Sequence, residues 1–164
     1  MTSLTKIWWK SNLPIYNISH SELYSKGITC LLLDVDGTLI NRKTNSIPIK
    51  VKQWIKKSKE YFSLYLISNN PSEKRISSIG NELGLEYKHK ALKPSKKNTL
   101  KIIKKLNRDK ENIAIVGDRI LTDIIVGNRC NIHTILVKKL NKNGLPIRIN
   151  IILLIERLIS FFIV

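Results

Sequence analysis

The amino-acid sequence predicts an α/β fold, in which a parallel, Rossmann-like sheet forms the middle of a three-layer α/β/α sandwich. Short apolar runs alternate along the chain with segments of helical spacing, which is typical of parallel sheets covered on both faces. Polar clusters directly follow three of these runs. Because the carboxyl ends of parallel strands meet at one edge of a sheet, we expect a functional site there. A length of 164 residues suits a single domain over residues 1–164.

Residues 1–27 are expected to form an N-terminal segment, with a short helix at residues 19–25 before Gly27. Trp8 and Trp9 lie beside lysines. Such an aromatic pair either covers one edge of the core or rests at a membrane interface. We favour the first interpretation, because aromatic pairs serve more often in cores.

Five strands and four helices are expected after Gly27. The strands are at residues 28–34, 61–67, 85–91, 112–116 and 132–138. The helices are at residues 49–60, 71–83, 94–106 and 122–129. Proline favours the first turn of a helix and glycine its end, so Pro71 and Pro94 mark helix starts and Gly84 marks a helix stop. The polar residues 39–48 predict a loop or a small hairpin.

The chain is strongly basic, with 29 Lys and Arg against 12 Asp and Glu and a formal net charge of +17. Such a field attracts phosphates, nucleic acid and anionic lipid, although Lys, Asn and Ile are abundant everywhere, as in the product of an AT-rich genome. Cys30 and Cys130 predict buried free thiols in a reducing cytosol rather than a disulfide. The beginning of the chain does not resemble a secretory signal.

The last segment, residues 146–164, is apolar at nearly every position except Arg148, Glu156 and Arg157. It is too short and too interrupted for a membrane span, so no transmembrane span is expected. A C-terminal apolar helix that closes the sheet is the favoured interpretation. The alternative is a helix that lies in a membrane surface or at a partner interface.

The stretch Asp34-Val35-Asp36-Gly37-Thr38 carries the strongest functional signal, because it follows a buried apolar run. Carboxylates two residues apart on a strand point to the same side. Burying two like charges there is costly without a cation or another partner, and Gly37 allows the chain to turn sharply. The pattern indicates a strand end that carries a nucleophile, an acid/base group and a metal site.

The sequence DVDGT, followed in order by Ser68, Lys93 and Gly117-Asp118 with Asp123, resembles the four motifs of the haloacid dehalogenase (HAD) superfamily of phosphatases. Residues 116–137, VGDRILTDIIVGNRCNIHTILV, are similar to the YqeG family, class IIIA phosphatases of bacteria and plastids, in their GD–TD–GNR pattern. The opening segment and the apolar tail are similar to that family too. The resemblance implies a HAD-type sheet and phosphatase activity.

The resemblance also implies a role for each matching residue. Asp34 is the expected nucleophile, which forms an aspartyl-phosphate, and Asp36 is the expected general acid and base. Ser68 would offer its hydroxyl and backbone N–H to phosphoryl oxygens, and Lys93 a fixed positive charge. The expected catalytic residues are Asp34, Asp36, Ser68 and Lys93. The expected substrate-binding residues are Thr38, Ser68, Asn69 and Lys93.

Mg²⁺ is the expected cofactor, because hard cations take carboxylate and phosphate oxygens as ligands. The expected metal ligands are Asp34, Asp36 (through its backbone carbonyl), Asp118 and Asp123. Structural roles stay open for some of these residues: Ser68 and Asp123 are also suited to capping helices. Arg129 is either an exposed cation at a helix stop or a substrate contact, and Arg119 stands where the family often has a neutral polar residue.

The intervals from Thr38 to Ser68 and from Ser68 to Lys93 hold a helix and a strand each, so we expect no cap domain. An uncovered site admits large substrates. The YqeG family is similar to enzymes that dephosphorylate phosphatidylglycerophosphate in phosphatidylglycerol biosynthesis. The leading hypothesis is therefore a Mg-dependent phosphomonoester hydrolase that acts on such a lipid phosphate, with anionic lipid at a membrane surface as its partner.

Two alternatives stay open. One is a phosphatase that acts on nucleic-acid ends or nucleotides, and the other is a basic protein that docks RNA or protein with little catalysis. No interleaving of aromatic and basic residues marks a base-stacking surface, which ranks nucleic acid below lipid. The expected location is the cytoplasm, with peripheral attachment to the inner face of a membrane as an extension of the lipid hypothesis.

Overall fold

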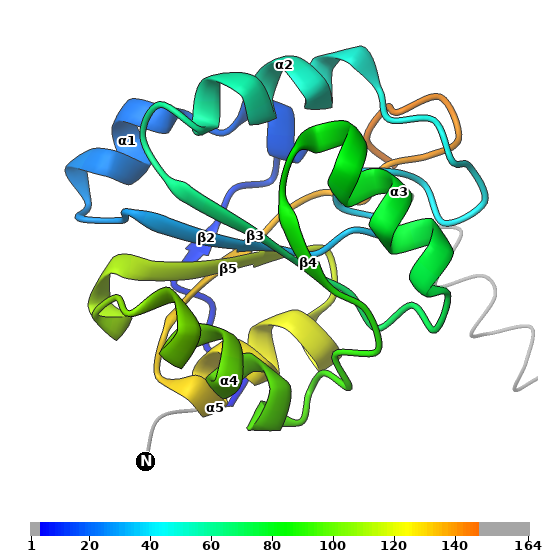
Figure 1. Ribbon diagram of the computed structural model, residues 1–164. Helices are drawn as coiled ribbons and strands as arrows, with labels where there is room; N and C mark the ends of the chain where they lie inside the picture. Colours follow the sequence, from blue (N-terminus) through cyan, green and yellow to red (C-terminus); the bar gives the residue numbers. More distant parts are fainter. Residues whose placement is uncertain (1–3, 148–164) are drawn as a thin grey trace, which may run out of the picture.

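The computed structural model describes residues 4–147, which form one parallel sheet with helices on both faces (Figure 1). Its strands are β1 (Trp9–Lys10), β2 (Cys30–Leu33), β3 (Ser63–Ile67), β4 (Glu86–Lys88), β5 (Ile113–Gly117) and β6 (His133–Leu136). They lie in the order β1-β6-β5-β2-β3-β4, and every neighbouring pair is parallel.

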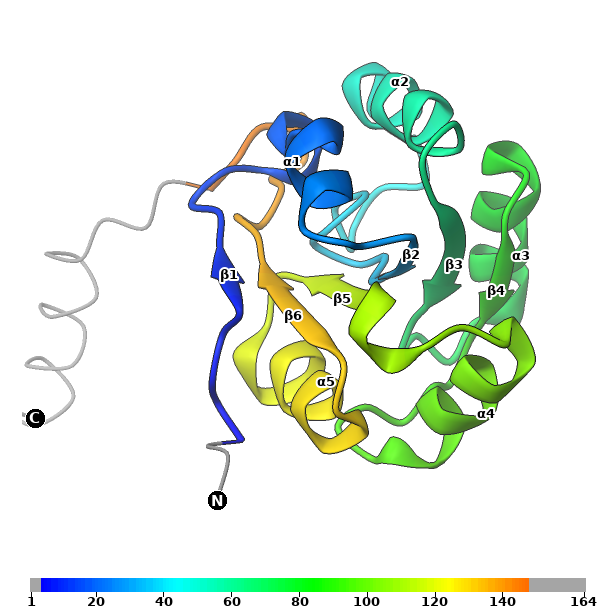
Figure 2. The same cartoon turned by 90° about the vertical axis from the view of Figure 1, so that its left-hand side faces the viewer.

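The helices lie in two layers (Figures 1 and 2). One face carries α1 (His20–Ser25), α2 (Ile49–Ser58) and α3 (Glu73–Leu83), and the other carries α4 (Lys96–Leu106) and α5 (Ile125–Cys130). Three short turns, η1 (Ile15–Asn17), η2 (Lys110–Asn112) and η3 (Ile120–Ile124), complete the described elements. The expected three-layer α/β/α sandwich is confirmed, and between residues 4 and 147 nothing is inserted that would form a cap.

Strand β2 shows why the apolar runs predicted buried strands. All four of its residues are fully buried: Leu31 and Leu33 face the core beneath α2 and α3, whereas Cys30 and Leu32 face the core beneath α4 and α5. A strand that is covered on both faces needs apolar residues at every position rather than at alternate ones. Cys30 and Cys130 are both buried and free, as predicted.

Three local details refine the sequence expectations. Residues 39–48 form the expected loop and not the alternative hairpin, and the Gly37 N–H donates to the Ile40 carbonyl at 2.7 Å where this loop begins. The helix expected at 122–129 is present, and it begins with the π-helical turn η3 and continues as α5. Strand β1 was not expected, because two residues are too few to show strand alternation.

The N-terminal segment packs on the sheet. Trp9 pairs with Ile135 across β1 and β6, and the Trp8 ring lies 4.3 Å from the His133 ring, centroid to centroid. Both tryptophans are partly buried against the core, as the favoured interpretation requires. Of the apolar helix expected over 146–164, only Pro146 and Ile147 lie within the described residues, and they are not helical. No helix within residues 4–147 is long and apolar enough to cross a membrane.

Candidate active site

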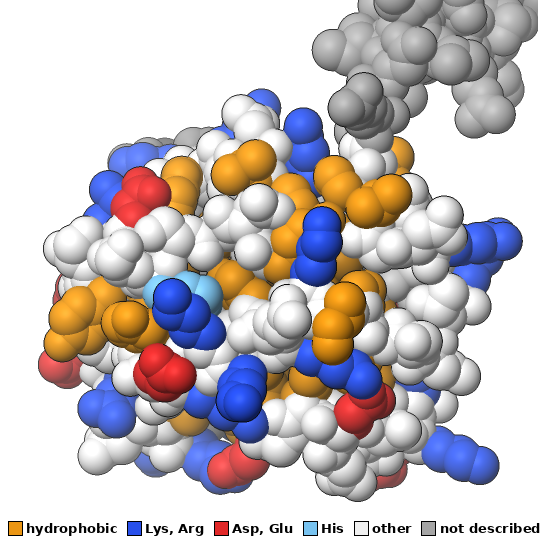
Figure 3. Space-filling view, turned by 90° about the horizontal axis from the view of Figure 1, so that it is seen from above, with side chains coloured by type: hydrophobic (Ala, Val, Ile, Leu, Met, Phe, Trp, Pro, Cys, Tyr) orange, Lys and Arg blue, Asp and Glu red, His pale blue; other side chains and the backbone are white. Residues whose placement is uncertain are grey.

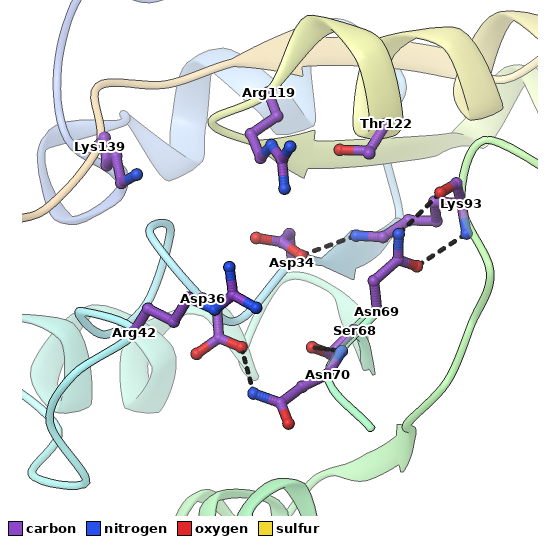
Figure 4. Close-up of a pocket in the computed structure, with 10 residues that line it drawn as sticks. All are labelled: Asp34, Asp36, Arg42, Ser68, Asn69, Asn70, Lys93, Arg119, Thr122 and Lys139. Carbon is purple, nitrogen blue, oxygen red and sulfur yellow. Dashed lines mark hydrogen bonds and ion pairs between the residues drawn. The ribbon is translucent and has the colours of Figure 1, made fainter. Parts of the chain in front are cut away.

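A cavity of about 310 Å³ opens beyond the carboxyl ends of β2, β3 and β5 (Figure 4). The chain runs from β2 outward through β3 and β4, then returns to place β5 on the other side of β2. In open α/β sheets such a reversal leaves a crevice in which ligands bind. The walls are formed by Asp34, Asp36, Arg42, Ser68, Asn69, Asn70, Lys93, Arg119, Thr122 and Lys139.

The inner part of the site is a buried network that we call the inner cluster: Asp34, Thr38, Lys93, Asp118 and Asp123. Its centre is the Lys93 ammonium group, whose side chain is 1% exposed. The Nζ atom donates to Asp34 Oδ1 at 2.7 Å, to Asp123 Oδ1 at 2.5 Å and to the Ile67 carbonyl at 2.9 Å. All three protons of the ammonium group are therefore used within the protein.

The three carboxylates of the inner cluster lie close together. One oxygen from each of Asp34, Asp118 and Asp123 lies within 4.8 Å of the other two. Among the described residues, only Lys93 forms an ion pair with them, so the three carboxylates have one directly paired cation. Oxygen ligands with surplus negative charge fit a hard divalent cation such as Mg²⁺.

Burial, and to a smaller extent the neighbouring negative charges, shifts the protonation equilibria of the Asp34 and Asp118 carboxyl groups. Burial raises the pKa of Asp34 to about 7, although the positive charge of the nearby Lys93 lowers it. Burial also raises the pKa of Asp118, and the neighbouring Asp123 raises it further, whereas Lys139 lowers it. Buried carboxyl groups resist ionisation until a cation stabilises the charged form.

Two glycines make room for this network. Gly37 has a φ of +105°, and a Cβ atom there would lie 2.5 Å from Asp118 Oδ2. At Gly117, the last residue of β5, a Cβ atom would lie 2.3 Å from the Asp123 Cγ atom. The carboxylates of Asp118 and Asp123 thus occupy space that any other residue would fill with its side chain.

The outer part of the site, which we call the outer cluster, consists of Asp36, Asn70 and Arg75. The Arg75 Nη2 atom lies 2.9 Å from Asp36 Oδ1, and the Asn70 Nδ2 atom lies 2.7 Å from Asp36 Oδ2. Arg75 is in the first turn of α3, and it also donates to the Asn41 carbonyl at 3.2 Å. The Asp36 side chain is thereby held at the cavity wall with 15% of its surface exposed.

The structure shows contacts within the protein for Thr38, Ser68 and Asn69, and substrate binding by Ser68 and Asn69, which line the cavity, stays a prediction. The fully buried Thr38 hydroxyl donates to Asp34 Oδ2 at 3.2 Å, with Asp118 Oδ1 at 3.4 Å, so it positions carboxylates instead of lining the cavity. The Ser68 N–H donates to the Lys88 carbonyl, which leaves only the hydroxyl for a substrate. The Asn69 side chain exchanges two hydrogen bonds of 2.7 Å with the backbone of Lys93 and so fixes that loop.

Of the four aspartates that we expected to bind the metal ion, three lie together. Asp34, Asp118 and Asp123 form the carboxylate trio, whereas the Asp36 carboxylate is not part of it. A metal contact through the Asp36 backbone carbonyl stays a prediction. Lys93 lines the cavity, but a contact with phosphate would require it to exchange one of its three internal hydrogen bonds.

Sequence reasoning did not find several residues of the site. Arg75, Arg42 and Lys139 were hidden among the many basic residues of the chain, and only Asn70 had a signal, as part of the polar cluster after β3. Arg119 lines the cavity. Arg129 does not: its Nη1 atom donates to the Pro94 carbonyl at 3.0 Å, so it ties α5 to the Lys93 loop.

Comparisons with known proteins agree with this geometry. A family profile described as mitochondrial PGP phosphatase matches residues 2–140. The chain is 29% identical over 123 residues to the probable phosphatase YqeG of Bacillus subtilis, which covers 75% of this chain and 72% of that protein.

Among solved structures, an uncharacterized protein from Listeria monocytogenes is similar, with a TM-score of 0.57 at 20% identity, over 75% of this chain and 84% of the other. A putative 3-deoxy-D-manno-octulosonate 8-phosphate phosphatase from Vibrio cholerae has a TM-score of 0.53 at 16% identity, over 76% and 82%. The corresponding enzyme of Moraxella catarrhalis, solved with magnesium and phosphate ions, has a TM-score of 0.51 at 17% identity, over 74% and 84%.

At these identities the solved structures establish the fold alone, whereas the profile covers most of the chain and the matching motif residues converge on one cavity. The chain belongs to the mitochondrial PGP phosphatase family, and it is a phosphatase of the haloacid dehalogenase type.

Proposed function

We propose that the protein is a Mg²⁺-dependent phosphomonoester hydrolase that works through an aspartyl-phosphate on Asp34. The observation that carries the proposal is the Asp34 carboxylate itself. It lies at the cavity wall, is held by Lys93 at 2.7 Å, and belongs to a carboxylate trio with surplus negative charge. The Moraxella catarrhalis enzyme, which has the same fold, binds magnesium and phosphate ions.

The proposed reaction consists of two successive displacements at phosphorus, each assisted by residues of this chain. An Asp34 oxygen attacks phosphorus, the bond from phosphorus to the ester oxygen breaks, and Asp36 donates a proton to the departing alcohol. Asp36 then takes a proton from water, the water oxygen attacks phosphorus, and the bond to Asp34 breaks to release phosphate. Arg75 and Asn70 hold Asp36 at the wall where both proton transfers would occur.

Asp34, Asp118 and Asp123 would hold the metal ion, which supplies positive charge that offsets repulsion between the Asp34 carboxylate and the phosphate. Lys93 keeps Asp34 in one orientation and balances part of its charge. The Ser68 hydroxyl, which accepts from the Asn70 N–H at 3.1 Å, keeps its own proton for a phosphoryl oxygen.

A lipid phosphate is the substrate class that we propose. Leu92, Ile120 and Leu121 are 64%, 40% and 69% exposed, and they adjoin the cavity-lining residues Lys93, Arg119 and Thr122 in sequence. Apolar side chains that extend into solvent beside a basic cavity suit a membrane surface that displays anionic lipid. The family is described as mitochondrial PGP phosphatase, and phosphatidylglycerophosphate, the lipid that the sequence resemblance implies, is the first to test.

The test measures phosphate release from phosphatidylglycerophosphate in vesicles with Mg²⁺, for the wild-type protein and for Asp34→Asn. We expect release by the wild type and a loss of about a thousandfold or more in the variant, because an amide is not a nucleophile. Asp109→Asn, at an exposed carboxylate remote from the cavity, is the control. No release by the wild type, together with release from single-stranded oligonucleotide ends, would reject the lipid in favour of nucleic acid.

A further inference from the structure

Lys93 reaches the inner cluster from the segment between β4 and α4, residues 89–95, which we call the Lys93 loop. Buried and exposed residues alternate along it: Ala91 and Lys93 are 0% and 4% exposed, whereas Leu92 is 64% exposed. Lys90 and Leu92 have φ values of +44° and +60°, a left-handed conformation that residues with a Cβ atom rarely adopt. The loop therefore needs support from the surrounding structure to keep this shape.

The Asn69 side chain, from the segment after β3, holds the centre of the Lys93 loop. It exchanges two hydrogen bonds of 2.7 Å with the Lys93 backbone (Figure 4). The Ala91 N–H donates to the Ser68 carbonyl at 2.9 Å, so the same segment also fixes the preceding part of the loop. Because Asn69 lines the cavity, its substitution would change any contact with substrate as well as the position of Lys93.

Two side chains that do not line the cavity hold the two ends of the Lys93 loop. The Asn98 Nδ2 atom, at the start of α4, donates to the Lys90 and Ala91 carbonyls at 3.3 and 3.1 Å. The Arg129 Nη1 atom, at the end of α5, donates to the Pro94 carbonyl at 3.0 Å. Any effect of these two side chains on the chemistry of the cavity therefore has to pass through the loop.

Charge and exposure alone do not distinguish Arg129 from the other basic residues of the protein. Lysines and arginines are scattered over the face seen in Figure 3, as expected for a net charge of +17. Arg129 is itself exposed, and the sequence left it as either an exposed cation or a substrate contact. Its hydrogen bond to Pro94, 35 residues earlier in the chain, indicates a third role that neither interpretation contained.

The position of the Lys93 backbone decides whether the ammonium group can meet three acceptors at once. The Nζ atom lies 2.7 Å from Asp34 Oδ1, 2.5 Å from Asp123 Oδ1 and 2.9 Å from the Ile67 carbonyl oxygen. Hydrogen bonds weaken steeply as their geometry departs from this range, and a catalytic group has to be held within about 0.5 Å of its productive position. Movement of the loop would therefore loosen the cation from the nucleophile.

We propose that Asn98 and Arg129 are positioning residues, which hold the Lys93 loop and through it keep the Lys93 ammonium group in the geometry that the reaction requires. The proposal rests on the phosphatase activity proposed above and adds two residues, neither of which lines the cavity, on which turnover depends. Because their contribution is to pre-organise Lys93, their loss should lower kcat without a matching rise in KM.

The reactivity of Lys93 toward an amine-acetylating reagent tests the proposal without substrate. In the wild type the Lys93 side chain is 1% exposed, so we expect slow acetylation by sulfosuccinimidyl acetate, measured by peptide mass spectrometry. Asn98→Ala and Arg129→Gln should each be acetylated at Lys93 severalfold faster, because local opening of the loop exposes the amine. The exposed Lys43 is the internal reference for the reagent.

Two control variants separate the loss of loop contacts from general loosening and from loss of charge. Asn128→Ala, at the neighbouring residue of α5, removes hydrogen bonds of 2.7 and 2.8 Å to the Leu4 and Lys6 carbonyls. Arg108→Gln removes an exposed positive charge that does not line the cavity. Both variants should keep the wild-type rate of acetylation at Lys93.

Steady-state phosphate release from phosphatidylglycerophosphate then measures the effect on turnover. We expect kcat of Asn98→Ala and Arg129→Gln to fall about threefold to tenfold with KM near its wild-type value, and the control variants to keep both constants. Acetylation at the wild-type rate in Asn98→Ala and Arg129→Gln, an equal acceleration in the controls, or faster acetylation without a fall in kcat would each overturn the proposal. Absence of phosphate release by the wild type would overturn the catalytic proposal, and acetylation would still decide whether these residues hold Lys93.

Discussion

The inner and outer clusters use the same kinds of side chain in different ways. In the inner cluster, Lys93 and Asp123 are each 1% exposed at the side chain, and every proton of the ammonium group has an acceptor. In the outer cluster, Asp36 and Arg75 are 15% and 14% exposed, and Asp36 lines the cavity. Both contain a carboxylate paired with a basic group, but the outer pair is more exposed than either ion pair of Lys93.

The difference matches what each carboxylate would do in the proposed reaction. A nucleophile and a metal site need charges fixed in one geometry, which burial and complete hydrogen bonding provide. A proton-transfer group must exchange protons with an alcohol and with water, so it has to be accessible. We therefore expect changes in the inner cluster to affect stability and activity together, and changes in the outer cluster to affect mainly turnover.

Lys93→Met should have the largest effect, because it leaves Asp34 and Asp123 buried without their cation. Breaking a buried ion pair by removing one partner typically costs about 3–5 kcal/mol of stability, and we expect phosphate release to fall about a hundredfold or more. Urea unfolding and the phosphate assay measure the two effects. Lys90→Met, at an exposed lysine three residues earlier, is the control. A Lys93→Met protein with wild-type stability would contradict the comparison.

Gly37→Ala should have the next largest effect, through Asp118. The new Cβ atom would lie 2.5 Å from Asp118 Oδ2, so the carboxylate must move, and a φ of +105° strains any residue other than glycine. We expect a loss of about 1–3 kcal/mol of stability and a higher Mg²⁺ concentration for half-maximal phosphate release.

Gly27→Ala is the control that separates the loss of stability from the change in Mg²⁺ requirement. Its φ of +80° also strains alanine, but the nearest atom to its Cβ, Asn112 Nδ2, is 3.7 Å away and far from the site. This control should lose stability without a change in Mg²⁺ requirement. If both variants require the same Mg²⁺ concentration as the wild type, Asp118 is not a metal ligand.

Arg75→Gln should have the smallest effect on the folded state, because it acts on the partly exposed outer cluster. We expect the stability to change by less than about 1 kcal/mol and kcat to fall about tenfold with little change in KM, since Asp36 loses its fixed position. Arg75→Lys should restore only part of kcat, because an ammonium group lacks the planar fork, whose Nη2 atom donates to Asp36 while its Nη1 atom donates to Asn45. Steady-state kinetics measure both constants.

The exposed ion pair Lys52–Glu82 provides the control for that variant. Its side chains are 43% and 40% exposed, and they join α2 and α3 away from the cavity. Lys52→Gln should leave kcat at the wild-type value. A loss of stability in Arg75→Gln as large as in Lys93→Met would remove the distinction between the clusters.

The sequence by itself predicted the elements and the candidate motif residues. The apolar run of β2, the glycine stop after α3 and the carboxylates after β2 and β5 are local signals, because strand burial, helix ends and sharp turns depend on neighbouring residues. The order of the motifs then placed Asp34, Ser68 and Asp118 at one edge of the sheet. The elements required only the periodicity and the turn residues within about ten positions. The candidate roles of Ser68, Lys93 and Asp118 came from the resemblance to the motifs of the family.

Only the tertiary structure decided which side chains hold those residues and which ones face the substrate. The Asn69 side chain forms hydrogen bonds with the Lys93 backbone, and Arg75 forms an ion pair with Asp36. The cavity also brings together Arg42, Arg119 and Lys139. Each of these arrangements joins segments that are far apart in the sequence. Among 29 basic residues, nothing local distinguishes Arg75 or Lys139 from a solvated lysine. The partner of a charge is set by how helices and loops pack, and that packing is a property of the whole fold.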